Sequence, residues 1–224
     1  MIKGFQKLTL LDYPGKIAAI IFTGGCNFRC PYCHNASLLR DEGDEVAEKE
    51  IFDYFKKRKG IIDGVVVTGG EPLIHEETIE LIKKLKAEGL GVKLDTNGSF
   101  PEKLKYLIEN KFVDYIAMDI KTVYENYSTV TDGKNVTDKI KESVKLIMSS
   151  GTDYEFRTTI AEGLHTEKDI IGAAKQICGA KKFFLQNFKD SGDVLCSGLK
   201  PFSLEKMQTF KTLCTPFADF VDIR

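Results

Sequence analysis

A short apolar run leads into a glycine turn in the stretch Gly64-Val65-Val66-Val67-Thr68-Gly69-Gly70-Glu71-Pro72. β-Branched residues in a run of this length favour a buried strand. The two glycines permit a tight turn, and Pro72 suits the start of a helix. Residues 77–88 then show helical periodicity, with apolar residues on one face and Glu and Lys on the other. This part of the chain therefore predicts a strand, a turn and a helix in direct succession.

The same succession recurs along the chain and defines the predicted architecture. The other apolar runs are residues 17–22, 90–94, 113–118, 154–160 and 182–185, and the other helical segments are residues 48–59, 102–109, 138–149, 167–177 and 203–213. Six strands, each followed by a helix, predict an α/β protein with a parallel sheet and right-handed crossovers. An eight-unit barrel takes about 250 residues, so six units indicate either a partial, open (β/α)6 barrel, which we expect from the family resemblance described below, or a doubly wound sheet. In both cases we expect a single domain over residues 1–224. The polar stretch at residues 124–135 predicts a surface loop.

Composition and charge exclude several classes of protein. The chain has 224 residues, with 32 Lys and Arg against 33 Asp and Glu and a net charge of -1, so it lacks the basic excess typical of nucleic-acid binders. It has no apolar run of about 18 residues that would span a membrane and no signal-peptide pattern at its start. We therefore expect a cytoplasmic protein without nucleic-acid or membrane partners, whose cysteines are reduced.

Three cysteines follow the run at residues 17–22, at the edge of the predicted sheet where ligands of α/β folds bind. Cys26, Cys30 and Cys33 have the spacing C-x3-C-x2-C. A structural zinc site needs a fourth ligand, usually from a second cysteine pair, and no such pair follows. Haem attachment at C-x-x-C-H or a glutaredoxin-like dithiol would leave Cys26 unused. A [4Fe–4S] cluster uses all three thiolates and keeps one iron open for a substrate or cofactor. No metal-binding spacing connects the remaining cysteines, Cys178, Cys196 and Cys214.

The cysteine loop resembles that of the radical SAM enzymes, in which an aromatic residue, here Tyr32, precedes the last cysteine. The resemblance implies that S-adenosylmethionine chelates the open iron through its amino and carboxylate groups. It also implies that the reduced cluster cleaves the cofactor to methionine and a 5′-deoxyadenosyl radical. The sequence Thr68-Gly69-Gly70-Glu71-Pro72 matches the GGEP motif of this family, in which the backbone and the acid hold the amino group of the cofactor. An ammonium group beside the Glu71 carboxylate is chemically sensible.

The loops after two later runs also have counterparts in the family. Asp95-Thr96-Asn97-Gly98 resembles a loop that lies near the carboxylate and ribose of the cofactor. Asp119-Ile120-Lys121 resembles a D-x-K sequence that faces the active site in the glycyl-radical-enzyme activases. In some of these proteins the two acids, here Asp95 and Asp119, also hold a monovalent cation beside the cofactor carboxylate. Lys121 is the candidate catalytic residue, because it would offset the charge of that carboxylate or steady the leaving methionine.

Three further polar residues are candidate cofactor contacts. Arg157 lies in a strand that is otherwise apolar on one face, and an arginine in this setting is seldom buried without an anion partner. That partner is either the cofactor carboxylate or one of the two acids, and the alternative is a guanidinium that simply reaches solvent. Asn187, which follows Gln186 at the end of the sixth strand, and Asn35 in the cysteine loop offer donors and acceptors for adenine or ribose.

The N-terminal third of the chain narrows the resemblance. The run Thr9-Leu10-Leu11-Asp12-Tyr13-Pro14-Gly15-Lys16 and residues 22–35 look like the activating proteins of anaerobic ribonucleoside-triphosphate reductase. This likeness implies an activase that takes one electron from a reduced flavodoxin or ferredoxin and removes a hydrogen atom from a backbone glycine of a partner glycyl radical enzyme. Two alternatives stay open. One is a radical SAM enzyme acting on a small molecule, such as a nucleoside-modifying synthase, and the other is a cytosolic iron–sulfur redox protein without S-adenosylmethionine chemistry.

Overall fold

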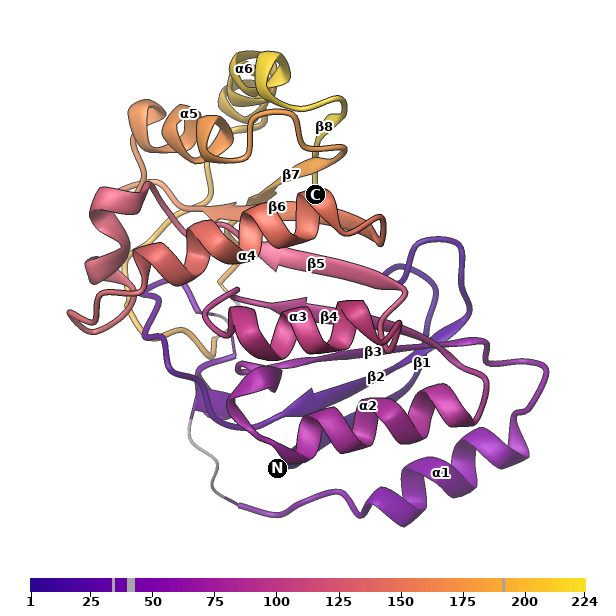
Figure 1. The fold of residues 1–224 in the computed structure, drawn as a ribbon. Helices are drawn as coiled ribbons and strands as arrows, with labels where there is room; N and C mark the ends of the chain where they lie inside the picture. The colour runs from indigo at the N-terminus through magenta and orange to yellow at the C-terminus, as the bar shows by residue number, and fades with distance from the viewer. Residues whose placement is uncertain (34, 40–42, 191) are drawn as a thin grey trace.

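The fold is an open, eight-stranded sheet whose strand order follows the sequence (Figure 1). The structure is a computed structural model that describes residues 1–33, 35–39, 43–190 and 192–224. β1 pairs with β2 in the antiparallel sense, and every later pair of neighbours is parallel. The strands are β1 (Ile2–Thr9), β2 (Ala18–Thr23), β3 (Gly64–Gly69), β4 (Gly91–Thr96), β5 (Tyr115–Asp119), β6 (Asp153–Ile160), β7 (Phe183–Asn187) and β8 (Val221–Ile223).

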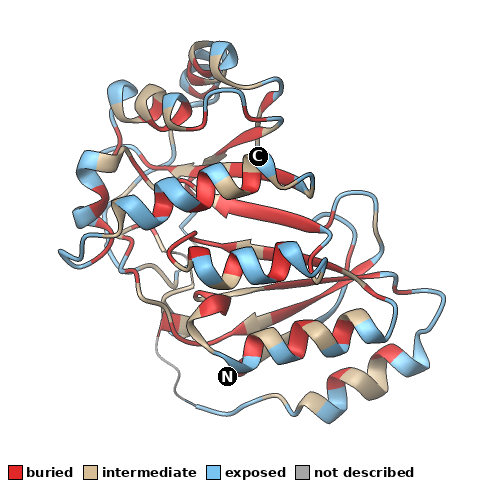
Figure 2. Cartoon of the chain, in the orientation of Figure 1, coloured by how far each residue is buried: buried red, intermediate tan, exposed pale blue. Residues whose placement is uncertain are grey.

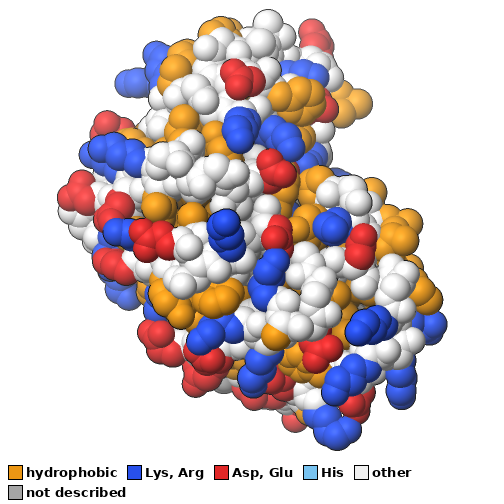
Figure 3. Space-filling model, turned by 45° about the vertical axis from the view of Figure 1, so that its right-hand side comes forward, with side chains coloured by type: hydrophobic (Ala, Val, Ile, Leu, Met, Phe, Trp, Pro, Cys, Tyr) orange, Lys and Arg blue, Asp and Glu red, His pale blue; other side chains and the backbone are white. Residues whose placement is uncertain are grey.

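An α-helix follows each strand from β2 to β7, and the helices lie along one side of the sheet (Figure 1). In the described part of the chain no helix is both long and apolar enough to span a membrane. Basic and acidic side chains are interspersed over the face of the molecule seen in Figure 3. The helices are α1 (Glu48–Lys57), α2 (Glu77–Ala87), α3 (Pro101–Glu109), α4 (Thr137–Ser149), α5 (Glu167–Gln176) and α6 (Leu204–Cys214).

The six predicted strand–helix pairs are all present, from β2–α1 to β7–α6, which confirms the α/β fold. The expected number of strands is wrong by two, because β1 and β8 extend the sheet at its two edges. β1 has an exposed middle and β8 only three residues, so neither forms the apolar run that marks a buried strand. The predicted surface loop at residues 124–135 is also partly wrong. It contains the 3-10 helix η3 (Tyr124–Thr129), in which Tyr127 is only 1% exposed.

The main hydrophobic core lies between the sheet and the helices (Figure 2). Val65 and Val67 of β3 contribute to this core, together with Leu81, Ile82 and Leu85 of α2. Each such side chain stabilises the fold by about 1.5–3 kcal/mol when it is fully buried. The alternate residues of the strands point to the inner face of the sheet, and this face holds the candidate site.

The loop between β1 and β2 packs beneath the inner face, at the amino ends of the parallel strands. Tyr13 from this loop is buried against Tyr115 of β5, with ring centroids 6.1 Å apart. The hydroxyl of Tyr115 donates to the fully buried Glu155 (2.8 Å), and Glu155 also accepts two hydrogen bonds from Arg224 (2.6 and 2.9 Å). These contacts fill the inner face at its amino end, so the space left for a ligand lies toward the carboxyl ends of the strands.

Candidate cofactor site

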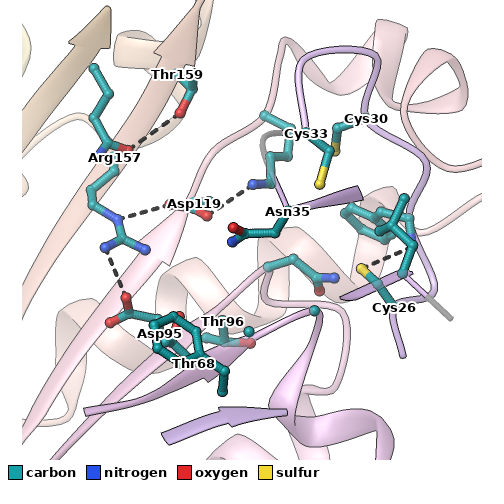
Figure 4. A pocket seen from close by; sticks show the side chains of 18 of the residues that line it. Cys26, Cys30, Cys33, Asn35, Thr68, Asp95, Thr96, Asp119, Arg157 and Thr159 are labelled. Carbon is teal, nitrogen blue, oxygen red and sulfur yellow. Dashed lines mark hydrogen bonds and ion pairs between the residues drawn. The ribbon is translucent and has the colours of Figure 1, made fainter. Parts of the chain in front are cut away.

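A cavity of about 350 Å³ lies among the carboxyl ends of the strands (Figure 4), within the range of small-molecule sites in proteins. Its walls come from the cysteine loop after β2 and from the ends of β3 to β7. The predicted site residues that line it are Cys26, Cys30, Tyr32, Cys33, Asn35, Gly69, Gly70, Asp95, Thr96, Asn97, Asp119, Lys121 and Arg157. The strand-end position of these residues, read from the sequence, therefore brings most of them into one place.

The Gly-Gly turn after β3 lies directly against the cysteine loop. The N–H of Gly70 donates to the carbonyl of Thr23 (2.9 Å), and the N–H of Glu71 donates to the carbonyl of Gly25 (2.9 Å). A Cβ atom on Gly70 would lie 2.0 Å from the carbonyl oxygen of Gly25, and Gly69 has a φ of +127°. Neither position accepts a side chain without displacing the backbone. The two glycines therefore set the position of the cysteine loop as well as lining the cavity.

The three cysteines share one wall of the cavity (Figure 4). The N–H of Phe28 donates to Sγ of Cys26 (3.4 Å), and the N–H of Cys33 donates to the carbonyl of Cys30 (3.0 Å), so the loop turns tightly between the thiols. Burial raises the pKa of the Cys26 thiol to about 12 and that of Cys30 to about 11. Because a coordinated thiol is deprotonated outright, these two groups need the positive charge of a bound metal to become ligands.

The arrangement of the thiols fits an iron–sulfur cluster better than a single ion. Among the described residues, no group of three or more His, Cys, Asp or Glu side chains is placed to hold one metal ion. Cysteine ligands of a [4Fe–4S] cluster bind separate irons, so they have to surround a common space rather than meet at one point. Cys26, Cys30 and Cys33 satisfy this condition, and with three cysteines one iron would remain open.

The main chain of Lys121 is held by the predicted site residue Tyr32 and by two residues that the sequence analysis did not single out, Tyr127 and His165. The hydroxyl of Tyr32 donates to the carbonyl of Lys121 (3.1 Å), and the N–H of Lys121 donates to the hydroxyl of Tyr127 (3.2 Å). Nε2 of His165 lies 3.4 Å from the same carbonyl, while Nδ1 accepts from a backbone N–H. Phe28 of the cysteine loop packs edge-on against Tyr127, with centroids 6.5 Å apart. The cysteine loop and Lys121 are therefore held as one unit.

Asp95, Asp119 and Arg157 lie across the cavity from the cysteines (Figure 4), and ion pairs with Lys93 and Lys121 extend them to a continuous array of five charged side chains. Arg157 donates from Nε to Asp119 (2.9 Å) and from Nη1 to Asp95 (3.0 Å). Lys93 pairs with Asp95 (2.5 Å), and Lys121 pairs with Asp119 (2.9 Å). Burial alone would raise the pKa of the Asp119 carboxyl, but Arg157 and Lys121 outweigh burial and hold that pKa well below its ordinary value. The sequence-based expectation that Arg157 pairs with one of the acids is thus confirmed for both of them.

Glu71 is not among the residues that line the cavity, and its expected contact with the cofactor ammonium stays a prediction. The carboxylate is fully buried and accepts from the N–H of Leu73 (3.1 Å), the hydroxyl of Thr96 (2.8 Å) and the N–H of Asn97 (2.6 Å). Burial raises the pKa of Glu71 to about 7 against the lowering effect of these donors. Glu71 therefore connects the turn after β3 to the loop after β4.

Asn187 is likewise not among the residues that line the cavity, and its expected contact with adenine or ribose stays a prediction. Its side-chain amide donates to the carbonyl of Phe202 (2.8 Å) and accepts from the N–H of Phe202 (2.9 Å). Both polar atoms of the side chain are thus used to fix the segment before α6. The neighbouring Gln186 lines the cavity instead, together with Thr68 and Thr159. Successive residues of a strand point to opposite faces, and this alternation separates Gln186 from Asn187.

The fold and the site together define a class of protein: an α/β enzyme with an open barrel, a three-cysteine loop and a cofactor cavity at the strand ends. Residues 20–176 match the family described as "Radical SAM superfamily". The chain belongs to this superfamily. Its cofactors are therefore a [4Fe–4S] cluster and S-adenosylmethionine, and the cavity residues fit both groups.

Individual relatives are consistent with this family. The chain is 34% identical over 200 residues to the "Putative glycyl-radical enzyme activating enzyme MJ1227" of Methanocaldococcus jannaschii, covering 86% of this chain and 82% of that protein. It is 31% identical to the pyruvate formate-lyase-activating enzyme of Clostridium pasteurianum, over 65% of this chain and 63% of that enzyme. A radical SAM methyltransferase from Sphaerobacter thermophilus shares the fold with a TM-score of 0.71 at 14% identity, over 95% of this chain and 67% of that chain.

Proposed function

We propose that this chain is an activating enzyme of a glycyl radical enzyme, and that its partner is an anaerobic ribonucleoside-triphosphate reductase. The main support is the similarity to a protein named as a glycyl-radical enzyme activating enzyme, which extends over 86% of this chain. Relatives named as pyruvate formate-lyase-activating enzymes support the same activity. The reductase is favoured as partner by the likeness of residues 9–16 and 22–35 to its activating proteins. On this proposal, residues 1–224 act as one domain in the cytoplasm.

The proposed roles follow from the walls of the cavity. Cys26, Cys30 and Cys33 hold the cluster. The space between the cysteine wall and the charged array would hold S-adenosylmethionine, and Asp95, Thr96, Asn97 and Asn35 also line this space. Gly69 and Gly70 allow the backbone to approach both the cysteine loop and the cofactor. The ammonium of Lys121 lies beside Asp119 and near Cys30 and Cys33, where it would place a positive charge near the methionine end of the cofactor.

The proposed reaction uses one electron from a donor protein and transfers one hydrogen atom from the partner to the cofactor. When bound, the cluster and S-adenosylmethionine would supply cleavage of the C5′–S bond by one electron from a reduced flavodoxin or ferredoxin and removal of a hydrogen atom from a glycine Cα of the partner, with methionine, 5′-deoxyadenosine and a glycyl radical as products. The protein itself orients the reacting carbon and limits the access of water to it.

The decisive experiment is electron paramagnetic resonance on the reconstituted pair. The chain is reconstituted with iron and sulfide under anaerobic conditions, reduced, and mixed with S-adenosylmethionine and a candidate partner. A glycyl doublet with the anaerobic reductase, but not with pyruvate formate-lyase, supports the full proposal. A doublet with pyruvate formate-lyase alone would contradict the proposed partner but would still support the proposed activase activity.

The same reconstituted protein tests the alternatives. One relative, 26% identical over 60% of this chain, is named as a probable GTP 3′,8-cyclase, so GTP and other nucleosides form a further arm of the experiment. Cofactor cleavage that is stimulated by a nucleoside, with no glycyl doublet in any protein mixture, would contradict the activase. Cys30→Ala is the control that loses one cluster ligand, and it is expected to lose both cofactor cleavage and the doublet.

A further inference from the structure

The charged array in the cavity wall leaves no carboxylate oxygen unpaired. Oδ1 of Asp95 pairs with Lys93 (2.5 Å) and Oδ2 with Arg157 (3.0 Å). Oδ1 of Asp119 pairs with Arg157 (2.9 Å) and Oδ2 with Lys121 (2.9 Å). Each of the four oxygens thus already accepts a hydrogen bond from a cationic group. Charge-assisted bonds of this kind are about twice as strong as neutral ones.

The next oxygen along the same loop is committed as well. The hydroxyl of Thr96 donates to Glu71 (2.8 Å) and accepts from the N–H of Gly98 (3.1 Å). The hydroxyl therefore takes part in the turn that carries Asp95, and it is directed toward Glu71 rather than toward the two acids. A hard cation is bound through several oxygen ligands at once, and the side-chain oxygens of Asp95, Asp119 and Thr96 all take part in hydrogen bonds within the protein.

The sign of the charge leads to the same result. Lys93, Arg157 and Lys121 contribute three positive charges and the two acids contribute two negative ones, so the array has a net charge of +1. A further cation would enter a region that is already positive and mostly buried, where charges interact more strongly than in water. The surplus positive charge instead favours a negatively charged ligand group such as a carboxylate.

We propose that the guanidinium of Arg157 is the resident cation of this site, and that the site takes no alkali metal ion. Arg157 lies between the two acids and bridges them, so it occupies the position that a metal ion would need. It is a positioning residue, because it holds in place the wall that faces the cofactor. S-Adenosylmethionine then binds with the same affinity whether or not Na⁺ or K⁺ is present. The inference rests on the proposed placement of the cofactor beside these residues, but it is independent of the partner.

The first test measures the affinity of the reconstituted protein for S-adenosylmethionine by calorimetry. The buffers have matched ionic strength and contain choline, Na⁺ or K⁺ as the only added cation. The dissociation constant of the native protein is expected to agree within about twofold among them. A gain of about tenfold or more in Na⁺ or K⁺ would overturn the proposal, while the glycyl-radical experiment would still test the activase on its own.

The second test opens the site. Arg157→Ala leaves Asp95 Oδ2 and Asp119 Oδ1 without their donors and reduces the net charge of the array to zero. We expect this variant to bind the cofactor about tenfold or more weakly in choline, with recovery on addition of K⁺ or of methylguanidinium at low concentration. Arg157→Lys keeps the charge and is expected to stay independent of the added cation. Equal affinity of Arg157→Ala in every buffer would contradict the bridging role.

A third measurement does not need the cofactor. Thermal unfolding of the cluster-free Arg157→Ala protein is expected to shift upward with K⁺ or methylguanidinium relative to choline, whereas the native protein does not respond. Arg224→Ala is the matched control, because Arg224 pairs with the single acid Glu155 at the other end of the inner face. Its stability is expected to fall equally in all buffers. An equal cation-dependent rise in the native protein would overturn the proposal.

Discussion

Replacement of Glu71 by glutamine isolates the effect of one buried carboxylate without changing its shape. Oε1 of Glu71 accepts from Leu73 and Thr96, and Oε2 accepts from the N–H of Asn97 at 2.6 Å. Glutamine keeps one carbonyl oxygen and turns the other position into an NH₂ group. The amide hydrogen of Asn97 then faces a donor in a site that excludes water. A buried donor without an acceptor costs about 1–3 kcal/mol.

The difference in the free energy of unfolding between the native protein and Glu71→Gln is expected to depend on pH. Burial raises the pKa of Glu71 from 4.5 to about 7, so the native state holds the proton more tightly than the unfolded chain. The group therefore lowers the stability of the native protein progressively as the pH rises through this range. At about 1.4 kcal/mol per pKa unit, the loss is about 3 kcal/mol. Glutamine does not titrate, so the variant lacks this loss.

The free energy of unfolding of both proteins is measured in urea, on cluster-free, reduced protein at about pH 5 and about pH 8. Glu71→Gln is expected to be about 1–3 kcal/mol less stable than the native protein at the lower pH. That deficit is expected to shrink by about 2–3 kcal/mol at the higher pH, enough to vanish or change sign. Exposed Glu80→Gln on α2 is the control, with a change below about 0.5 kcal/mol at both pH values. A Glu71→Gln deficit that is the same at both pH values would refute the reasoning.

Three further substitutions test the roles assigned to single residues. Gly70→Ala places a Cβ 2.0 Å from a carbonyl oxygen of the cysteine loop, and this variant is expected to contain less iron after reconstitution. An iron content equal to that of the native protein would contradict the packing argument. Lys121→Met removes the ammonium 2.9 Å from Asp119 and is expected to slow 5′-deoxyadenosine formation by about 10- to 100-fold, so an unchanged rate would exclude its role. Asn187→Ala is expected to destabilise the fold without weakening S-adenosylmethionine binding, whereas Gln186→Ala is expected to weaken binding without destabilising the fold. Urea unfolding measures the stability of each variant, and calorimetry measures its affinity for the cofactor.

The position of the site could be predicted from the sequence, because it depends only on where the parallel strands end and not on the conformation of single side chains. Asp95, Asp119 and Arg157 come from three different strands, and parallel strands bring their carboxyl ends to one edge of a sheet. The direction of a side chain beyond the strand end is set by the following turn instead. The Glu71 carboxylate turns toward the loop after β4, and the Asn187 amide turns toward the segment before α6. No periodic pattern in the sequence encodes either direction.

Residues that hold the site through packing contacts could not be predicted from the sequence. Tyr127 lies in a polar stretch that reads as a surface loop, yet it is buried against Phe28 and bonded to the main chain of Lys121. His165 approaches the same main chain from more than 40 residues further along the chain. Their function depends on contacts between distant segments, whereas sequence patterns report on neighbours. β1 escaped detection similarly, because its pairing with β2 substitutes for an apolar pattern of its own.

The alternation within β4 shows why charge was placed inside this barrel. Val92 and Leu94 belong to the core under the helices, whereas Lys93 and Asp95 point to the inner face, where Lys93 is only 2% exposed. A strand buried on both faces usually carries apolar residues throughout, and a buried ion pair adds little or no net stability. The same charges can act on a ligand that enters the cavity, because charges interact more strongly in a partly buried site than in water. Replacing Lys93 alone by an apolar residue would leave Oδ1 of Asp95 without its donor and would therefore destabilise the fold. It would also reduce the array from a net +1 to a neutral wall.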